Sequence, residues 1–320
     1  MQVLEEIKKR GKMVDEAIEK LLPIIQPEEL YKASRYLLDA GGKRIRPAML
    51  IIAAESVGGD IQKVLPAAVA IELIHNFTLI HDDIMDQDEL RRGHPTVHLK
   101  WGLPAAILAG NTLYSKAFEI IAQIDAPPKI ISRCICILSK TCADICEGQW
   151  MDMEFEKRGS VSENEYMDMV QKKTSVLFAT SAMIGGLLGG ATNKIAKSLW
   201  EAEIKIGVGF QIRDDVLDLI IPEVKIGKRR GNDLMEKKKT LIIIHALKNS
   251  NKLYSLSRKA SREEIDAAVQ QLRDLGSIDY AMDKAVELVE QGKSKLDVLP
   301  DSRPKELLME LADYMVTRTY

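Results

Sequence analysis

Residues 75–92, HNFTLIHDDIMDQDELRR, constrain the fold of this chain more than any other stretch. The first half is mostly apolar and typical of a buried helix, but the run ends in Asp82, Asp83 and Asp86. On a helix that turns about 100° per residue, Asp82 and Asp86 lie about 40° apart on one face. Carboxylates so close repel each other and are costly beside a core unless a cation holds them. The segment therefore predicts either a Mg²⁺ site or a solvated helix end where aspartates happen to cluster.

A second acidic segment repeats this pattern. GFQIRDDVLDL also follows an apolar helical run, and it places Asp214, Asp215 and Asp218 at the same spacing. Two helices that end in the same DDxxD pattern are hard to attribute to chance. We therefore predict two carboxylate clusters that face each other across a cavity. Several Mg²⁺ ions held between them would bind a diphosphate and draw charge from its leaving oxygens.

Three basic segments are candidates for binding that diphosphate. Arg binds phosphate through two parallel hydrogen bonds, and Lys acts as a point charge. A basic segment alone is more often a solvated surface patch. Two of these segments directly follow an acidic cluster, however, and this position favours a diphosphate site. The segments are GGKRIRP with Lys43, Arg44 and Arg46, ELRRGHP with Arg91 and Arg92, and KIGKRRGNDLMEKKKT with Lys228, Arg229, Arg230 and Lys237 to Lys239.

The rest of the chain reads as a succession of helices. Apolar residues recur at spacings of three and four, as in VLEEIKKRGKMVDEAIEKLL, and strand signals are few. Without an internal repeat or a low-complexity linker, these patterns predict one all-α domain over residues 1–320. The glycine pairs at 185–186 and 189–190 would allow close helix packing or ligand access, and packing is the favoured interpretation. The expected helices are 2–22, 27–40, 44–57, 61–86, 101–123, 128–156, 162–189, 193–220, 233–248, 262–275, 277–297 and 303–318.

Composition narrows the range of partners and compartments. A net charge of −2 and a pI near 6.3 argue against a nucleic-acid partner. The N-terminus lacks the apolar core of a secretory signal. The apolar stretch 65–84 is interrupted by Glu72, His75, Asn76 and the aspartates, which predicts no membrane span. We expect a cytoplasmic protein.

Four cysteines lie close together in one apolar segment, at positions 134, 136, 142 and 146. A zinc site or disulfides are possible readings. The spacing lacks a CxxC pair, however, and the surrounding sequence is helical, where a free cysteine behaves as a small buried hydrophobe. We therefore predict reduced cysteines in the core.

Five segments, in order, resemble the motif set of the trans-prenyltransferases, the short-chain isoprenyl diphosphate synthases of the polyprenyl synthetase family. The resemblance covers residues 41–242 and is greatest to the archaeal-type geranylgeranyl diphosphate synthases. It implies the isoprenoid synthase fold, a helical bundle around a deep central cavity, and usually a homodimer. It also implies Mg²⁺, with three ions when diphosphate is bound. The segments are GGKRIRP, LIHDDIMDQDELRRGHPTVH, VQKKTS, GFQIRDDVLDL and GKRRGNDLMEKKKTL.

The resemblance also assigns roles to individual residues. The diphosphate of isopentenyl diphosphate would be bound by Lys43, Arg46, His75 and Arg92. The allylic diphosphate would be held by Mg²⁺ on Asp82, Asp86 and Asp214, with Asp83, Asp215 and Asp218 as second-layer or water-mediated partners. Around it would lie Arg91, Lys173, Thr174, Gln211, Lys228 and Lys238, of which Lys173, Thr174 and Gln211 are the candidate catalytic residues. The sequence departs from the family pattern in two places. At IIPEVKIGK the usual glycine-containing turn is replaced, so the alignment of Lys228 with the family motif is poorly defined. At position 237 a lysine stands where glycine is common.

The resemblance implies that product length depends on the residues four and five positions before the first aspartate, which here are Thr78 and Phe77. In the resembling family, a single aromatic at the fifth position is typical of geranylgeranyl (C20) synthases. Helical geometry places Phe77 about 140° from Asp82, so a packing role is the alternative. We expect C20 with some C15 from dimethylallyl, geranyl or farnesyl diphosphate. A farnesyl or longer-chain polyprenyl synthase is the main alternative. A terpene cyclase or a non-catalytic partner subunit would be expected to lack features that are present here.

Overall fold

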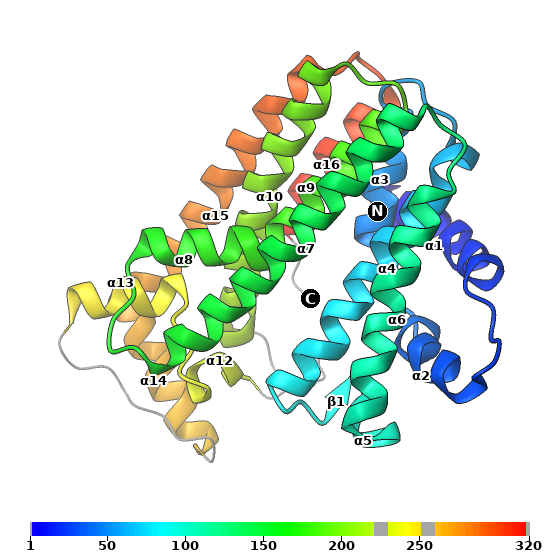
Figure 1. Cartoon of the computed structure of the whole chain (residues 1–320). Coiled ribbons are helices and arrows are strands. Elements are labelled where there is room, and N and C mark those ends of the chain that lie inside the picture. The colour runs from blue at the N-terminus through cyan, green and yellow to red at the C-terminus, as the bar shows by residue number, and fades with distance from the viewer. Residues whose placement is uncertain (1, 221–229, 251–259, 318–320) are drawn as a thin grey trace. The chain divides into compact units, whose positions relative to one another are not determined.

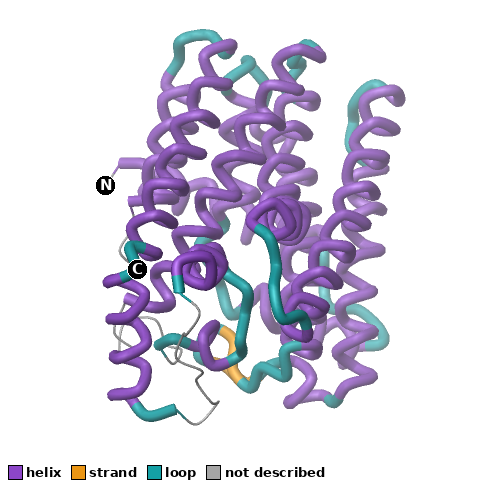
Figure 2. The backbone as a smooth tube through the Cα atoms, turned by 90° about the vertical axis from the view of Figure 1, so that its left-hand side faces the viewer, coloured by secondary structure: helices purple, strands orange, loops and turns teal. Residues whose placement is uncertain are grey.

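The described part of the chain is almost entirely helical. A computed structural model describes residues 2–220, 230–250 and 260–317. Within these ranges the only strands are β1 (Leu90–Arg91) and β2 (His94–Pro95), which form an antiparallel hairpin (Figures 1 and 2). The predicted all-α fold class is therefore confirmed.

Most of the expected helices are present with termini within two residues of their expected positions. The helices are α1 (Gln2–Leu21), α2 (Glu28–Asp39), α3 (Ile45–Glu55), α4 (Ile61–Met85), α5 (Val97–Trp101), α6 (Leu103–Ala122), α7 (Pro128–Lys157), α8 (Glu163–Val170), the π-helix η1 (Gln171–Ser175), α9 (Val176–Leu188), α10 (Asn193–Ile220), α12 (Asn232–Met235), α13 (Leu241–Asn249), α14 (Arg262–Asp274), α15 (Ser277–Lys293), the 3₁₀ helix η2 (Ser294–Val298) and α16 (Arg303–Thr317).

The single helix predicted over residues 233–248 is wrong. The structure has α12 and α13 there, separated by a turn at residues 236–240. Lys237 adopts a left-handed conformation with φ of 61°, and the Lys238 amide donates to the Asp233 carbonyl at 2.9 Å. A non-glycine residue in this conformation ends a right-handed helix. The periodicity of the apolar residues does not reveal such a break.

The chain forms two compact units, each assembled from separate stretches. Unit 1 contains Met1–Cys142, Thr180–Trp200 and Val298–Leu308. Unit 2 contains Ala143–Ala179, Glu201–Asp297 and Met309–Tyr320. Helices α7, α9, α10, η2 and α16 contribute residues to both units. The single domain over 1–320 stays a prediction, as does the deep central cavity.

Helix α4 is the core of unit 1. It begins at Asp60, whose side chain accepts a hydrogen bond from the Gln62 amide, and it lies beside α3 and α6 (Figure 1). Its middle is buried on all sides, so the three aspartates come at the point where the buried run ends. Close helix packing supports this core, since a methyl group at Gly189 would lie 2.8 Å from the Ala54 carbonyl oxygen. Gly185, Gly186 and Gly189 therefore serve packing, as favoured from the sequence, whereas a methyl group at Gly190, whose φ is 95°, would meet no described atom within 4 Å.

Among the described helices, α4 is the one that could cross a membrane, judged by its length and composition alone. Its most apolar window is 61% buried within the structure. The core helix of a folded protein passes the same test, so this is weak evidence for a span. The absence of a membrane span stays a prediction.

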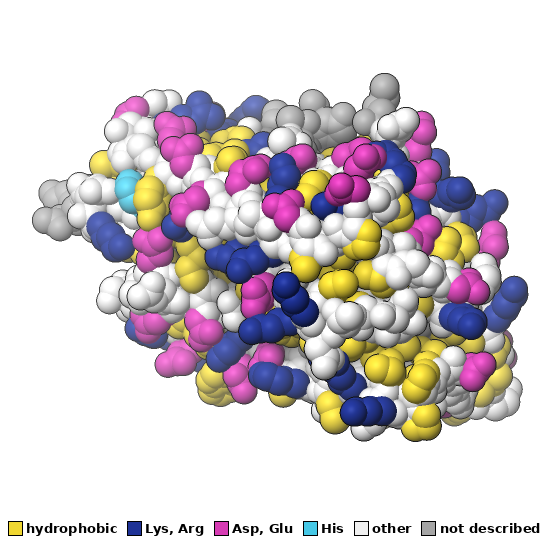
Figure 3. Space-filling view, turned by 90° about the horizontal axis from the view of Figure 1, so that it is seen from above, with side chains coloured by type: hydrophobic (Ala, Val, Ile, Leu, Met, Phe, Trp, Pro, Cys, Tyr) yellow, Lys and Arg dark blue, Asp and Glu magenta, His cyan; other side chains and the backbone are white. Residues whose placement is uncertain are grey.

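Basic and acidic side chains are interspersed on the face drawn in Figure 3. This mixture agrees with the net charge of −2. Nucleic-acid binding usually needs a surface on which positive charge predominates. The absence of a nucleic-acid partner stays a prediction.

The four cysteines are free, as predicted, but only two of them lie in the core. Cys134 and Cys142 are buried, whereas Cys136 and Cys146 are exposed. Because α7 turns by about 100° per residue, four cysteines at these spacings cannot all point to one side of the helix.

Glu203 on α10 is a buried carboxyl group in unit 2. It is 1% exposed, and its Oε2 has no hydrogen-bond partner within the residues that the structure describes. Burial raises the pKa of Glu203 to about 8, because the charged form loses its hydration. The neutral carboxyl group is therefore favoured in the folded state.

We predict that Glu203→Gln removes part of the pH dependence of stability. The stabilising contribution of a neutral Glu203 is complete below its ordinary pKa of 4.5 and is lost as the pH rises towards 8. The free energy of unfolding, measured with urea, should therefore fall less between pH 5 and pH 8 in the variant than in the wild type. The effect is about 1.4 kcal/mol per unit of pKa difference. The exposed Glu16→Gln is the control, and an unchanged pH dependence in Glu203→Gln would contradict the assignment.

Candidate functional site

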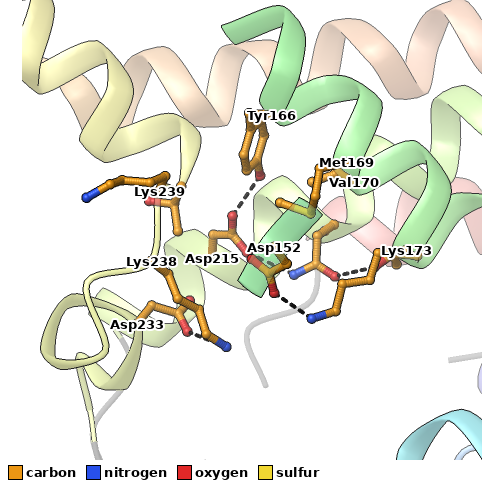
Figure 4. A pocket seen from close by; sticks show the side chains of 12 residues that line it. Asp152, Tyr166, Met169, Val170, Lys173, Asp215, Asp233, Lys238 and Lys239 are labelled. Carbon is orange, nitrogen blue, oxygen red and sulfur yellow. Dashed lines mark hydrogen bonds and ion pairs between the residues drawn. The ribbon is translucent and has the colours of Figure 1, made fainter. Parts of the chain in front are cut away.

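Unit 2 contains a polar pocket with about 450 Å³ of empty space, part of it open to solvent. Helices α7, α8, η1, α10 and α12 and the segment after α12 supply its lining (Figure 4). Five of the residues predicted for the allylic site lie in it, namely Lys173, Thr174, Gln211, Asp215 and Lys238. The lining residues are Asp152, Tyr166, Met169, Val170, Lys173, Thr174, Gln211, Asp215, Asp233, Lys238, Lys239 and Thr240.

A π-helical turn positions Lys173 and Thr174, which are adjacent in sequence and both line the pocket. Glycines on two neighbouring helices allow this turn to pack closely. A methyl group at Gly148 would lie 2.8 Å from the Lys173 Cα, and one at Gly207 would lie 2.8 Å from the Ser175 Cα. Turns of this kind are frequent at functional sites because they change the direction of side chains within a helix. The sequence predicted one unbroken helix here and gave no sign of the π turn.

Asp152 fixes the amino group of Lys173. The Lys173 Nζ donates to Asp152 Oδ2 at 2.6 Å, and both side chains are largely buried (Figure 4). Sequence analysis missed Asp152. The only signal for it in the sequence is its place on the α7 segment EGQWMDMEF, which also carries Glu147 and Glu154.

A chain of hydrogen bonds links the other polar groups of the pocket. Thr174 Oγ1 donates to Gln211 Oε1 at 3.0 Å, and Gln211 Nε2 donates to Asp215 Oδ1 at 2.8 Å. The buried Tyr166 hydroxyl donates to Asp215 Oδ2 at 2.7 Å. Both oxygens of Asp215 are therefore engaged by protein donors, which fits its predicted indirect role. Tyr166 is a second residue that sequence analysis missed.

The second acidic cluster carries more negative charge than its surroundings neutralise. Burial, and then repulsion from Asp233, raise the pKa of Asp215 and of Asp218 to about 7. Lys238 opposes both shifts, and its Nζ lies 3.8 Å from Asp233 Oδ1. A cation bound here would relieve this repulsion. Lys228, also predicted for this site, lies outside the described residues.

The three carboxylates of the first acidic cluster, in unit 1, differ in their burial and contacts. Asp83 is 1% exposed and accepts hydrogen bonds from Arg91 Nε at 2.7 Å and from Arg91 Nη2. Arg91 also bonds Asp88 at 2.9 Å. Asp82 and Asp86 are half-buried. Arg91 therefore neutralises Asp83, and a metal-binding role for Asp83 stays a prediction.

The chemistry of these acids fits Mg²⁺ that binds together with a phosphate ligand. Mg²⁺ usually takes one or two carboxylates and completes its shell with water and substrate phosphate oxygens. Within residues 2–220, 230–250 and 260–317, no three Asp, Glu, His or Cys side chains are grouped so that they could hold a metal ion by themselves. Half-buried Asp82, Asp86 and Asp214 offer the hard oxygen atoms that this mode of binding requires.

A cationic cluster forms the other polar site of unit 1. Arg46 Nη1 lies 3.5 Å from His75 Nε2, and Arg92 Nη1 donates to the Leu37 carbonyl at 2.8 Å and to the Gly41 carbonyl. Burial lowers the pKa of Arg46 to about 10 and also lowers that of Arg92. Burial and the neighbouring arginines hold the pKa of His75 well below 6.5, so His75 is neutral. This excess of buried positive charge suits an anionic ligand. Lys43, predicted with this group, is exposed on the loop before α3.

Phe77 and Thr78 point in different directions. The Phe77 ring packs edge-on against Tyr114 of α6 and against His81, with centroids 5.4 and 4.8 Å apart. Tyr114 in turn contacts Phe118 at 4.9 Å. The Thr78 hydroxyl donates to the His75 carbonyl of its own helix at 2.8 Å. Phe77 therefore belongs to an aromatic row between α4 and α6, whereas Thr78 does not.

Comparisons with known proteins agree with the resemblance of the motifs. A sequence model described as polyprenyl synthetase matches residues 27–274. The chain is 57% identical to a geranylgeranyl diphosphate synthase from Methanosarcina mazei, over 100% of this chain and 99% of the relative. It is 47% identical to a geranylfarnesyl diphosphate synthase from Natronomonas pharaonis, over 98% and 97% of the two chains.

The fold is similar to that of solved structures. The crystal structure of a geranylgeranyl pyrophosphate synthetase from Pyrococcus horikoshii superimposes with a TM-score of 0.94. The two sequences are 42% identical, and the match covers 99% of this chain and 98% of the other. This likeness confirms the predicted isoprenoid synthase fold.

We predict that Gly207→Ala lowers turnover in the condensation that the resemblance implies. The added methyl group would push the π turn and displace Lys173 and Thr174, and a displacement of about 1 Å costs roughly 10²-fold in rate. Steady-state kinetics should show a fall in kcat of tenfold or more.

Gly292→Ala in the same unit is the matched control. Its methyl group would lie 2.6 Å from the Ile206 Cγ1 and 2.8 Å from the Ala202 carbonyl oxygen, so the site is at least as crowded as that of Gly207, but neither atom belongs to the π turn. This variant should lose stability and keep its kcat. Equal losses of kcat in the two variants would contradict a positioning role for Gly207.

Proposed function

Because the chain belongs to the polyprenyl synthetase family and is a prenyltransferase, we propose that its main product is geranylgeranyl diphosphate. It would condense isopentenyl diphosphate with dimethylallyl, geranyl or farnesyl diphosphate and release diphosphate. The observation that carries the proposal is the full-length 57% identity to the Methanosarcina geranylgeranyl diphosphate synthase. A C25 product is the second candidate, because the Natronomonas relative at 47% identity is a geranylfarnesyl diphosphate synthase.

The cationic cluster of unit 1 binds the diphosphate of isopentenyl diphosphate in this proposal. Lys43, Arg46 and Arg92 supply positive charge, and the neutral His75 supplies a ring nitrogen as a donor. Arg92 is already oriented by two carbonyl groups, so little freedom is lost when the ligand binds. The lowered pKa values of Arg46 and Arg92 support this assignment, because an incoming anion would compensate their buried charge.

In this proposal the carboxylates of the acidic clusters would hold the metal ions that bind the allylic diphosphate. Members of this family use a divalent metal, and we infer three Mg²⁺ ions on Asp82, Asp86 and Asp214. When bound, Mg²⁺ supplies positive charge that favours departure of the diphosphate. The remaining acids, Asp83, Asp215 and Asp218, act indirectly, and Arg91, Lys228 and Lys238 complete the site.

Three side chains of the pocket would act on the reacting groups. Lys173, held by Asp152, stabilises the departing diphosphate, which takes the electron pair of the breaking carbon–oxygen bond. The oxygens of Thr174 and Gln211 stabilise the allylic cation, because their hydrogen bonds fix their direction. The double bond of isopentenyl diphosphate then forms the new carbon–carbon bond. The released diphosphate takes the proton that is lost.

Product length depends on the aromatic row of Phe77, Tyr114 and Phe118. Aromatic side chains in edge-on contact form a rigid wall, and such pairs contribute roughly 0.5–1.5 kcal/mol beyond their buried area. The growing chain would stop when its end meets Phe77. The packing of Phe77 on α6 supports this role, although the same contacts also serve the core of unit 1.

We also infer a cytoplasmic homodimer. Helix α6 exposes Leu103, Ile107 and Leu108, each at least 41% exposed. Apolar side chains grouped on one exposed helix favour contact with a partner surface, and homodimers are the commonest soluble assemblies.

The proposal predicts the size of the product. Incubation with labelled isopentenyl diphosphate, farnesyl diphosphate and Mg²⁺ should give mainly C20 on chromatography. Phe77→Ala should shift the main product to C25 or longer, because the wall of the cavity is removed. Wild-type product of C25 would favour the second candidate, and an unchanged length in Phe77→Ala would exclude Phe77 as the wall.

The metal assignment predicts the effect of removing one carboxylate. Asp82→Ala and Asp214→Ala should each lower kcat by a factor of 10² or more, while circular dichroism shows an intact helical fold. The exposed Asp125→Ala is the control and should keep wild-type turnover. Near-normal turnover in either site variant would be incompatible with the assignment.

A further inference from the structure

Arg44 differs from Lys43, its neighbour in GGKRIRP, because the Arg44 side chain is turned into the protein. The side chain is 4% exposed, whereas Lys43 beside it is exposed. Arg44 precedes the first residue of α3 and has a φ of 49°, in the left-handed region. This conformation costs about 1–2 kcal/mol for a residue with a side chain, so surrounding contacts must hold it.

The Arg44 guanidinium ties three helices to the start of α3. Nε donates to Asp15 of α1 at 2.8 Å, Nη1 donates to Glu72 of α4 at 2.6 Å, and Nη2 donates to the Leu38 carbonyl of α2 at 2.7 Å. A methyl group at Gly11 would lie 3.2 Å from the Arg44 Cβ, so α1 also packs closely against the side chain. These contacts fix both the backbone and the side chain of Arg44.

Glu72 connects this arrangement to the cationic cluster. It is 2% exposed, and its Oε1 accepts hydrogen bonds from Arg44 and from the buried Asn76 Nδ2, the latter at 2.8 Å. Glu72 lies three residues before His75 on α4, so the two side chains are neighbours on the helix surface. His75 is the ring that contacts Arg46 at 3.5 Å.

The charge of Glu72 acts on the cations that surround it. Burial lowers the pKa of Arg46 and of Arg92, and the Glu72 carboxylate opposes the shift in both residues. The same carboxylate also raises the pKa of Arg44. Glu72 is therefore a resident anion that allows several cations to be buried close together before any ligand arrives.

We propose that Arg44 and Glu72 form a positioning pair for the isopentenyl diphosphate site. Neither side chain reaches the substrate. Arg44 fixes the loop that carries Lys43 and Arg46, and Glu72 holds His75, Arg46 and Arg92 in their binding arrangement. This inference rests on the proposed function, and the alternative is an ion pair that serves stability alone.

A double variant separates positioning from stability. Replacing both members of a buried pair by apolar residues of similar size is often neutral for stability, whereas removal of one leaves a buried charge. Arg44→Met/Glu72→Met should therefore unfold close to the wild-type temperature. Its KM for isopentenyl diphosphate should rise tenfold or more, and its KM for farnesyl diphosphate should change less than twofold. An unchanged KM for isopentenyl diphosphate in the folded variant would overturn the proposal.

Arg35→Gln is the matched control. Arg35 is also a buried arginine of unit 1, with a side chain 7% exposed that is held by Glu19 and Asp39, but it does not contact the loop at residues 41–44. It should lose stability without a change in either KM. An equal rise in the KM for isopentenyl diphosphate would mean that any loss of buried charge has this effect, and the proposal would be wrong.

Asp15→Asn tests the pair even where the double variant does not fold. The Asp15 side chain is 53% exposed, so the substitution leaves no uncompensated charge in the core, yet it removes the negative charge of one partner of Arg44. The KM for isopentenyl diphosphate should rise about twofold to fivefold at an unchanged Tm. An unchanged KM would contradict the proposal. If the wild type does not consume isopentenyl diphosphate at all, the proposed function itself fails, which this comparison distinguishes from failure of the positioning pair.

Discussion

Charge buried beside apolar helices has to be neutralised by fixed partners, and the polar sites of both units depend on this requirement. In unit 1 Arg44 and Glu72 meet at 2.6 Å, and in unit 2 Lys173 and Asp152 meet at 2.6 Å. Removing one partner of a buried pair costs about 3–5 kcal/mol because the other charge is left uncompensated. Such pairs hold polar groups in place before a ligand binds. Stabilisation of a departing diphosphate needs charges fixed in this way.

The cost of forming these sites is also visible in the backbone. Every described non-glycine residue with a positive φ lies in or beside one of the predicted motifs, and these residues are Arg44, Gln87, Arg92 and Lys237. The π turn at residues 171–175 is a further departure from regular structure, and it carries Lys173 and Thr174. Strained conformations of this kind persist only where surrounding contacts fix them. In unit 1 those contacts are the ion pairs and the hydrogen bonds to backbone carbonyl groups that also orient the basic side chains.

The sequence predicted the helices well, because apolar periodicity is a local pattern. Apolar spacing locates α4 and α10, and the DDxxD pattern identifies the acids at their ends. It could not predict the break at Lys237 or the π turn, since these depend on tertiary contacts such as those of Gly148 and Gly207. It also missed Asp152 and Tyr166, because one polar residue on a helix of mixed composition has no characteristic spacing. The buried role of Arg44 was missed as well, since the assignment of roles within GGKRIRP covered Lys43 and Arg46 alone.

We propose that Asp82, Asp86 and Asp214 hold the metal ions that bind the diphosphate of the substrate. A crystal structure with Mn²⁺ and a non-reactive thiolo analogue of farnesyl diphosphate tests this proposal, because anomalous scattering locates the metal. We expect Mn²⁺ ions bonded to all three aspartates and to oxygens of the bound diphosphate. Manganese at only one acidic cluster, or a diphosphate bound away from both, would contradict it.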